Sequence, residues 1–386
     1  MELLSNTIQH YAWGSHEAIA EVQGRETPSA KPEAELWMGA HPSASSRCED
    51  GRTLRSIITV DPVNNLGAAT HKEFGPRLPY LMKLLAAAAP LSIQVHPDAN
   101  QAAEGFIREE DAGIHCADPK RNYVDSNHKP ELLCAITEFE ALCGFRPLGQ
   151  SRDLLAGLRL PELENYCRQL DEPGGLQRVV TDILTDQEPH LIARAVGAAC
   201  IQHLDNTQSP YAVAARIAQR YPGDIGVVVA LLLNHLRLQP GQALYVPAGV
   251  PHAYLGGTGI EVMANSDNVL RAGLTPKHVD VSEVLRVLSW DAGPPALVKS
   301  HNDGAGLEQW STPAREFVLF RAQLADRRLS LPVHGARIVF CLHGAVQLHS
   351  ADNSIDITAG QAAYVPDVDG DIALTGSGTA FVAGTH

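Results

Sequence analysis

An internal repeat, two β-like segments whose matching residues lie 119 positions apart, most strongly limits what this chain can fold into. The first copy, Pro240 to Tyr254, contains a Pro-Gly turn, a strand and a Pro/Gly-rich bend that presents His252. The second copy repeats it, with Gly360, Gln361, Tyr364 and Pro366 matching Gly241, Gln242, Tyr245 and Pro247. A β repeat of this kind indicates two jelly-roll modules. Asp371 matches His252 but has no recognisable partners, so we expect the C-terminal module to be metal-free and structural.

The segment that precedes the first repeat copy, residues 148–236, shows the spacing of apolar residues that is typical of helices. Apolar residues recur at helical spacing in Arg152 to Leu158, Leu191 to Val196 and Val213 to Ala218. We therefore expect a mainly β protein with an inserted α domain. Residues 1–147 and 237–300 would form a discontinuous central barrel, residues 148–236 the helical domain and residues 301–386 a degenerate C-terminal jelly roll.

Composition excludes several classes of function. The net charge is -14, and no basic run interrupts it, which argues against nucleic acid as a partner. The longest apolar run, Ile225 to Leu233, is too short to cross a membrane and predicts a buried helix. The seven Cys form no CxxC pair, and the N-terminus lacks the features of a signal peptide. These features predict a cytoplasmic protein without disulfides.

A short alternating stretch, Leu91 to Asp98, carries the first candidate ligands. Ser92, Gln94 and His96 alternate with apolar residues, so in a strand they share one face. An ordinary half-exposed strand has the same pattern. The combination with Glu131 and His252, each in its own unusual motif, favours one wall of a metal-binding cavity inside a β-barrel.

Other charged and aromatic residues stand in unusual surroundings. Pro130 holds its neighbours extended, so Lys129 and Glu131 should point the same way, although a weak surface ion pair would also fit. Lys83 interrupts an apolar strand, and a Lys there lies at a strand edge or faces an anion. Trp13 lies beside a Gly turn and lines a cleft or anchors the core. Arg271 lies in a polar loop, Asn265 to Lys277, that also fits a solvated turn.

Four separated motifs resemble those of the type I mannose-6-phosphate isomerases: Gln94-x-His96-Pro97, His128-Lys129-Pro130-Glu131, Pro247-Ala248-Gly249-x-Pro251-His252 and the loop from Asn265 to Lys277. Tyr11-Ala12-Trp13-Gly14 and Glu35 to Gly39 also look like that family, so the resemblance runs from about residue 10 to the end. The resemblance implies a central cupin-like barrel and one Zn²⁺ per chain, held by Gln94, His96, Glu131 and His252. His nitrogen and carboxylate oxygen are usual zinc ligands, and an amide oxygen is a weak neutral one. With both His neutral, this set leaves the complex at a charge of about +1, which suits polarisation of a substrate oxygen.

The reaction implied by the resemblance is the interconversion of mannose 6-phosphate and fructose 6-phosphate by proton transfer through an enediol. The family pattern implies that Arg271 is catalytic, and Lys129, His128 and Asp267 are candidates for acid–base work. A Lys beside a dication gives up its proton more readily, so Lys129 could act as the base. Ser92 and Lys83 are expected to bind the phosphate, with Lys277 and Trp13 as further substrate contacts. Lys83→Ala should then raise KM more than it lowers kcat.

Two alternatives remain from the sequence. Two His and one carboxylate also form the facial triad of Fe(II) oxygenases, although oxygen activation requires neither the Gln nor the nearby cations. A non-catalytic sugar-binding cupin is the second alternative, and the intact ligand set argues against it. The expected partner is a phosphorylated hexose, with no nucleic acid or membrane, and the chain is compatible with a monomer. His41 receives no role.

Overall fold

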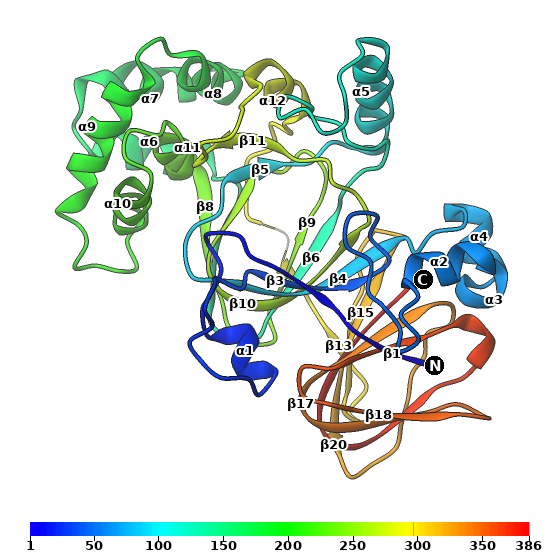
Figure 1. The fold of residues 1–386 in the computed structure, drawn as a ribbon. Coiled ribbons are helices and arrows are strands. Elements are labelled where there is room, and N and C mark those ends of the chain that lie inside the picture. The colour runs from blue at the N-terminus through cyan, green and yellow to red at the C-terminus, as the bar shows by residue number, and fades with distance from the viewer. Residues whose placement is uncertain (296, 386) are drawn as a thin grey trace.

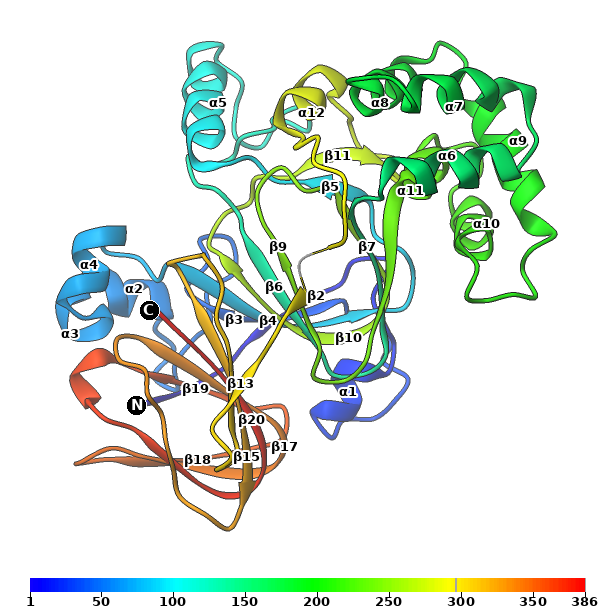
Figure 2. The ribbon, with the colours of Figure 1, turned by 180° about the vertical axis from the view of Figure 1, so that it is seen from behind.

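The computed structural model describes residues 1–295 and 297–385, which form two sheets and a cap of helices (Figures 1 and 2). The first sheet has eleven strands among the described residues, and the second has nine. The predicted fold class, mainly β with two jelly-roll modules and an inserted helical region, is confirmed. In the view of Figure 1, the helices of residues 148–232 lie above the first barrel and the second barrel lies below it.

The first barrel is organised around its long strand β10. One half of β10 pairs with β4 and β6, and the other half pairs with β5 and β7, so this strand connects the two walls. The strands of this sheet are β2 (Thr7–Gln9), β3 (Glu35–Gly39), β4 (Tyr80–Ala87), β5 (Ile93–Val95), β6 (Glu131–Ala135), β7 (Phe139–Phe145), β8 (Leu233–Leu238), β9 (Ala243–Val246), β10 (His252–Ala264), β11 (Leu270–Gly273) and β12 (Leu297–Val298).

The second barrel is built on the antiparallel pairing of two long strands, β17 and β20, and β17 also pairs with the repeat strand β19. Its strands are β1 (Glu2–Leu4), β13 (His301–Asn302), β14 (Leu307–Trp310), β15 (Val318–Ala325), β16 (Leu329–Ser330), β17 (Arg337–His349), β18 (Ser354–Thr358), β19 (Ala362–Val365) and β20 (Ala373–Gly384). The two repeat strands, β9 and β19, each lie where the sequence predicts a strand.

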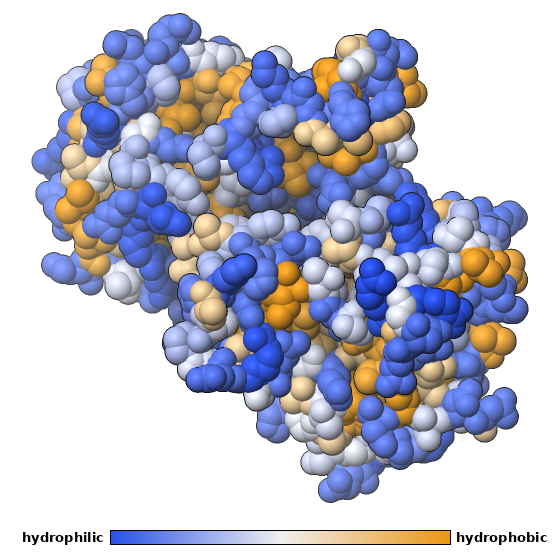
Figure 3. Space-filling view, in the orientation of Figure 1, coloured by the Kyte–Doolittle hydropathy of each residue, from blue (hydrophilic) through white to orange (hydrophobic). Residues whose placement is uncertain are grey.

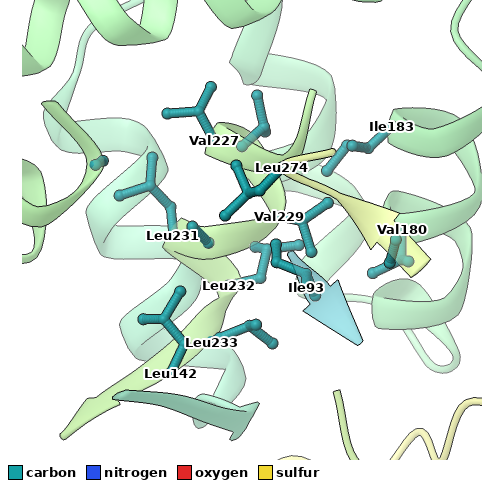
Figure 4. Packing of buried hydrophobic residues seen from close by; sticks show 14 of the residues in the cluster. Ile93, Leu142, Val180, Ile183, Val227, Val229, Leu231, Leu232, Leu233 and Leu274 are labelled. Carbon is teal, nitrogen blue, oxygen red and sulfur yellow. The ribbon is translucent and has the colours of Figure 1, made fainter. Parts of the chain in front are cut away.

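The helical region fills the interval between β7 and β8. It contains α6 (Leu148–Gly157), η1 (Pro161–Leu163), α7 (Glu164–Leu170), α8 (Gly175–Thr185), α9 (Pro189–Ile201), α10 (Pro210–Arg220) and α11 (Gly226–Leu232). Every residue of α11 is buried, as the apolar run predicts. Figure 4 shows Val227 and Val229 of α11 among Val180 and Ile183 of α8, close to Ile93 of β5. The helical core therefore supports the back of the strand that carries the predicted ligands.

The remaining helices lie around the barrels: α1 (Ala18–Val22), α2 (Leu54–Val60), α3 (Pro62–Leu66), α4 (Ala68–Phe74), α5 (Ala99–Asp111), α12 (Val281–Val287) and η2 (Asp367–Asp369). The predicted cap of α5 is confirmed: Asp98 and Gln101 form a capping box. Helices α2 and α3, which the sequence analysis missed, begin at the side-chain caps Thr53 and Asp61. None of the helices in the described part of the chain is long and apolar enough to span a membrane.

Two boundaries differ from the predicted division of the chain. Strand β1, assigned by sequence to the first barrel, pairs with β19 of the second barrel, with Leu3 opposite Ala363. Strand β8 begins at Leu233 and pairs with β7, so the first barrel resumes before residue 237. Both differences come from long-range pairing, which short apolar runs do not reveal.

Candidate active site

One wall of the site is a row of side chains across three neighbouring strands. Gln94 of β5 lies directly opposite His252 of β10 and also opposite Arg271 of β11. Residues opposite each other in antiparallel strands point to the same face, so these three side chains share the cavity face. Gln94 is half-buried, and its side chain makes no hydrogen bond with the described residues. Ser92, two residues earlier, is also half-buried.

The facing wall is formed by β3, β4, β10 and β6. Lys83 of β4 lies opposite Glu261 of β10 and Trp37 of β3. Glu261 lies opposite Leu133 of β6, and Glu131 is on the same side of β6 as Leu133 because side chains alternate along a strand. The pairing of β10 with β6 therefore places the Glu131 carboxylate on the inner surface of the barrel.

His96, Glu131 and His252 meet in one buried cluster, with candidate ligand atoms all within 4.8 Å of one another. His96 Nε2 lies 3.2 Å from Glu131 Oε1, and His252 Nε2 lies 3.4 Å from Glu131 Oε2. The three residues are distant in sequence: Glu131 and His252 begin β6 and β10, and His96 directly follows β5. The structure therefore brings together three of the four predicted metal ligands, with Gln94 on the strand beside them.

The two imidazoles have a defined tautomer. His96 Nδ1 lies 2.8 Å from the carbonyl of Asn268, and His252 Nδ1 lies 3.1 Å from the carbonyl of Val250. A carbonyl only accepts hydrogen bonds, so each Nδ1 carries a proton, and in the neutral form of either ring the lone pair of Nε2 is directed toward Glu131. Backbone carbonyls orient metal-binding His side chains in this way.

The surroundings of His96 and Glu131 shift their pKa values toward the protonation states that bind a metal, a neutral imidazole and an ionised carboxylate. Burial, and secondly the Lys129 ammonium, lower the pKa of His96 to about 4, so the ring is neutral near pH 7. Burial raises the pKa of Glu131, but Lys129 and the two imidazoles outweigh it and hold that pKa well below its usual value. Lys129 Nζ lies 3.1 Å from Glu131 Oε1, which confirms that the two side chains point the same way.

The donor set fits a divalent metal ion. His96 Nε2 is buried and has no hydrogen-bond partner among the described residues, although a carboxylate lies near it. Two bare nitrogens and an ionised carboxylate cannot satisfy one another, because all three are acceptors. A cation between them satisfies all three, and nitrogen and oxygen donors of this kind suit Zn²⁺.

Lys83 has two partners that the sequence analysis missed. Its ammonium lies 2.8 Å from Glu261 and 3.3 Å from Glu35, and all three side chains are buried. Burial lowers the pKa of Lys83, but the two carboxylates outweigh it, so the pKa is raised. Trp37 donates a hydrogen bond to Glu35, and the Lys83 ammonium lies 5.5 Å from its ring centre. Single acidic residues inside apolar strands, as at Glu261, were the available sequence signal.

Arg271 and Lys277 differ from Lys83 because neither forms an ion pair with a carboxylate of the described residues. Burial lowers the pKa of Arg271, and burial together with the Arg271 charge lowers the pKa of Lys277. Neither side chain has an ion-pair partner among residues 1–295 and 297–385. Two adjacent cations without an anion at the cavity edge form a natural site for an anionic ligand.

The other predicted site residues take varied positions. The Asp267 carboxylate is 44% exposed and lies 3.4 Å from His41 Nε2. His128 Nε2 lies 2.5 Å from Glu316 of the second barrel, so its ring is directed to the joint between barrels. Trp13 stacks on Tyr11 with ring centres 5.7 Å apart and packs partly against the core of the first barrel.

One face of the molecule is hollowed near the first barrel. In the space-filling view, a depression lies between the helical region and α5, above the first barrel (Figure 3). A jelly-roll barrel with a buried His-Glu-His cluster, cationic side chains and such an opening defines the class of cupin-type metalloenzymes.

Comparisons with known proteins narrow this class. Residues 1–148 match the family model "Phosphomannose isomerase type I, catalytic domain". The chain is 39% identical to the mannose-6-phosphate isomerase of Escherichia coli (strain K12), over 98% of each chain. It is 32% identical to mannose-6-phosphate isomerase 1 of Arabidopsis thaliana, over 96% of this chain and 90% of that one. The chain therefore belongs to the type I phosphomannose isomerase family.

Solved structures give the same result. A mannose 6-phosphate isomerase bound with zinc and yttrium superposes with a TM-score of 0.91 and 36% identity, covering 100% of this chain and 99% of that one. The apo form of the Salmonella typhimurium enzyme superposes with a TM-score of 0.91 and 37% identity, with the same coverage. Membership of this family, to which the sequence motifs pointed, argues against the oxygenase alternative.

Proposed function

We propose that this protein interconverts mannose 6-phosphate and fructose 6-phosphate by acid–base proton transfer, using one Zn²⁺ held by Gln94, His96, Glu131 and His252. The observation that carries the proposal is the convergence of two bare imidazole nitrogens and an ionised carboxylate in one buried cluster. Family membership supports the substrate, because the relatives over nearly the whole chain are mannose-6-phosphate isomerases.

The bound metal would polarise an oxygen of the open-chain sugar and so acidify the proton on carbon 2. The four proposed ligands would hold it from β5, the residue just after β5, β6 and β10, which are paired in one sheet and, at β5, packed against the helical core. Rigid support of this kind keeps ligand geometry constant during turnover.

We assign the proton transfer to Asp267 and Lys129. Burial raises the pKa of Asp267, but His41 and the charges of Lys129 and Lys83 hold it below its usual value, so the carboxylate is ionised and can accept a proton. Lys129 is paired with Glu131, which suits an ammonium donor. Asp267 would take the proton from carbon 2 while Lys129 protonates the carbonyl oxygen, giving an enediol.

The second half of the reaction restores both groups. Asp267 would return its proton to carbon 1, while Lys129 takes the hydroxyl proton from the oxygen on carbon 2. The product is the ketose, and no net proton is gained or lost. Arg271, on the same face as Gln94, would stabilise the negative charge that develops on the enediol oxygens.

The phosphate end is assigned to Arg271, Lys277 and Ser92. The first two are cations without a carboxylate partner among the described residues, and Ser92 is on the cavity side of β5. Lys83, also expected from sequence, already has Glu35 and Glu261 as anions. A second role for Lys83 in positioning the sugar would be compatible with this arrangement, and its phosphate contact stays a prediction.

A coupled assay for fructose 6-phosphate tests the proposal. We expect turnover of mannose 6-phosphate that disappears with a chelator and returns when zinc is added. Lys129→Met should reduce turnover strongly while leaving one zinc per chain. Absence of activity in the zinc-loaded protein, or undiminished activity after complete removal of metal, would contradict the proposal.

A further inference from the structure

His41 is a buried histidine in the cavity wall that has no part in the proposed ligand set. It lies two residues after the end of β3 and is 2% exposed. Its ring packs edge-on against Trp37, with ring centres 4.8 Å apart, and Trp37 in turn contacts Glu35 and Lys83. Its Nε2 atom lies 3.4 Å from Oδ1 of Asp267, the proposed base. This ring therefore lies between the interior of the barrel and the Asp267 carboxylate.

The tautomer of His41 is the reverse of that of His96 and His252. The backbone N–H of Ser43 donates to His41 Nδ1 at 3.3 Å, and Ser43 Oγ lies 2.8 Å from the same atom. An N–H group can only donate, so Nδ1 holds the lone pair and the neutral ring carries its proton on Nε2. That proton is directed at Asp267. A ring with a donor on Nε2 serves to orient an acceptor, whereas a metal ligand needs a bare nitrogen.

The backbone of Asp267 is fixed independently of its side chain. Its N–H donates to Asp125 at 2.9 Å, and the neighbouring Asn268 donates to two carbonyls of the 125–127 loop. The Asp267 carboxylate is different: among the described residues, His41 is the one basic side chain within 4.0 Å of it. The carboxylate is 44% exposed, so without this contact its rotamer has little to hold it.

We propose that His41 is a positioning residue for this reaction. Its Nε2–H holds one oxygen of Asp267, so that the other oxygen faces the substrate carbon, and Ser43 holds the ring in the required tautomer. The 3.4 Å separation is long for a hydrogen bond, as is common in catalytic pairs before substrate closes the site. The inference rests on the proposed function, because it assigns His41 a role through the proposed base.

Three variants of His41 separate positioning from packing. His41→Phe keeps the aromatic contact with Trp37 but has no donor. His41→Asn places an amide near the position of Nδ1, within reach of Ser43 only, whereas His41→Gln places an amide N–H near the position of Nε2. We expect Phe and Asn to lower kcat by about 10- to 100-fold with KM changed by less than about threefold, and Gln to recover much of the loss.

A double-mutant cycle makes the test specific. If His41 acts through Asp267, His41→Phe should reduce the residual turnover of Asp267→Asn little further. His235→Phe is the matched control, because it removes a His–carboxylate contact, 2.7 Å to Glu140, that lies outside the site. We expect it to keep the wild-type kcat. Zinc content and the melting temperature should stay close to wild type in the His41 variants.

An independent measurement keeps this inference apart from the proposed function. Nitrogen-15 NMR of His41 should report a neutral ring protonated on Nε2, whatever reaction the protein catalyses. The inference is overturned if the proton lies on Nδ1, if His41→Phe keeps full turnover, or if its effect multiplies fully with that of Asp267→Asn. Failure of the wild-type assay with zinc would instead overturn the proposed function.

Discussion

The two barrels share a strand register and differ in the charge that they place at one position of it. In the first barrel, Glu131 of β6 lies opposite Val246 of the repeat strand β9. In the second barrel, Arg337 of β17 lies opposite Val365 of the repeat strand β19. Val246 and Val365 are equivalent in the sequence repeat. A guanidinium therefore occupies the position at which the first barrel has its central carboxylate.

The surroundings of the two charges differ accordingly. Arg337 is fully buried and donates to the carbonyls of Gly370, Pro366 and Val333 at 2.7, 2.9 and 3.2 Å. Glu131 instead meets two imidazole nitrogens that carry lone pairs. The two terminal nitrogens of Arg337 find carbonyl acceptors within the chain, although its buried Nε has no hydrogen-bond partner among the described residues. A carboxylate among acceptors instead calls for a cation from outside. The same strand position thus holds a buried, hydrogen-bonded arginine in the second barrel and a candidate metal ligand in the first.

The largest effect is expected from neutralising the carboxylate of the first barrel. Glu131→Gln keeps the shape but removes the one anion among the proposed ligands, so zinc should be lost and kcat should fall by about a thousandfold or more. Zinc content after dialysis and the coupled assay measure the two effects. Asp371→Asn, at the repeat position of His252 and 94% exposed, is the control and should change neither. A Glu131→Gln protein with bound zinc and normal turnover would remove the contrast between the barrels.

The matching substitution in the second barrel should affect stability and leave catalysis intact. Arg337→Met removes the donor of one buried carbonyl, that of Val333, and of two partly buried ones, those of Pro366 and Gly370, which should lower the free energy of unfolding by about 3 kcal/mol. Thermal unfolding of the zinc-loaded protein gives the change in melting temperature, and kcat per folded molecule should stay at the wild-type value. A loss of turnover without a loss of stability would show that the second barrel takes part in the chemistry.

The same comparison shows what could be predicted from sequence. The repeat predicted two barrels and the strands β9 and β19, because Pro and Gly at fixed spacing mark turns in both copies. The meeting of His96, Glu131 and His252 followed from the family resemblance, since no local pattern specifies which distant strands pair. Strand alternation predicted the common face of Ser92, Gln94 and His96.

The missed features are long-range pairings. Glu35 and Glu261 compensate Lys83 only because β3, β4 and β10 are neighbours in this register. His41 and Asp267 are far apart in the sequence, and neither lies in a pattern that points to the other. The equivalence of Arg337 and Glu131 needs the strand register of both barrels. Buried charges in apolar strands signal that a partner exists without saying where it is.

A smaller effect on substrate binding should distinguish Lys277, which has no carboxylate partner among the described residues, from Lys83, which has two. Lys277→Ala should raise KM for mannose 6-phosphate by about tenfold with little change in kcat, because it removes binding that is equal in ground and transition states. Lys83→Ala leaves Glu35 and Glu261 as unpaired buried carboxylates, so we expect lower stability and lower kcat in addition to any change in KM. A pure KM effect in Lys83→Ala would instead support the sequence-based assignment of Lys83 to the phosphate.

The smallest expected effect concerns the joint between the two barrels. Burial raises the pKa of Glu316, but its contact with His128 outweighs this and lowers the pKa below its usual 4.5. A carboxylate with a lowered folded pKa stabilises the protein above the unfolded value, and the gain is lost as pH falls through the folded value. Glu316→Gln should therefore cost about 1 kcal/mol of folding free energy near pH 6 and progressively less as the pH falls below 4.5, measured by denaturant unfolding.

Arg315→Gln is the matched control. Arg315 pairs with Glu73 on an exposed part of the contact between the barrels, so this substitution should cost less. If Glu316→Gln proved as stable as wild type at pH 6, the two barrels would be held together by other contacts, such as those of Tyr80 with the second barrel. The contact between Glu316 and His128 would then serve only to direct His128 away from the metal cluster.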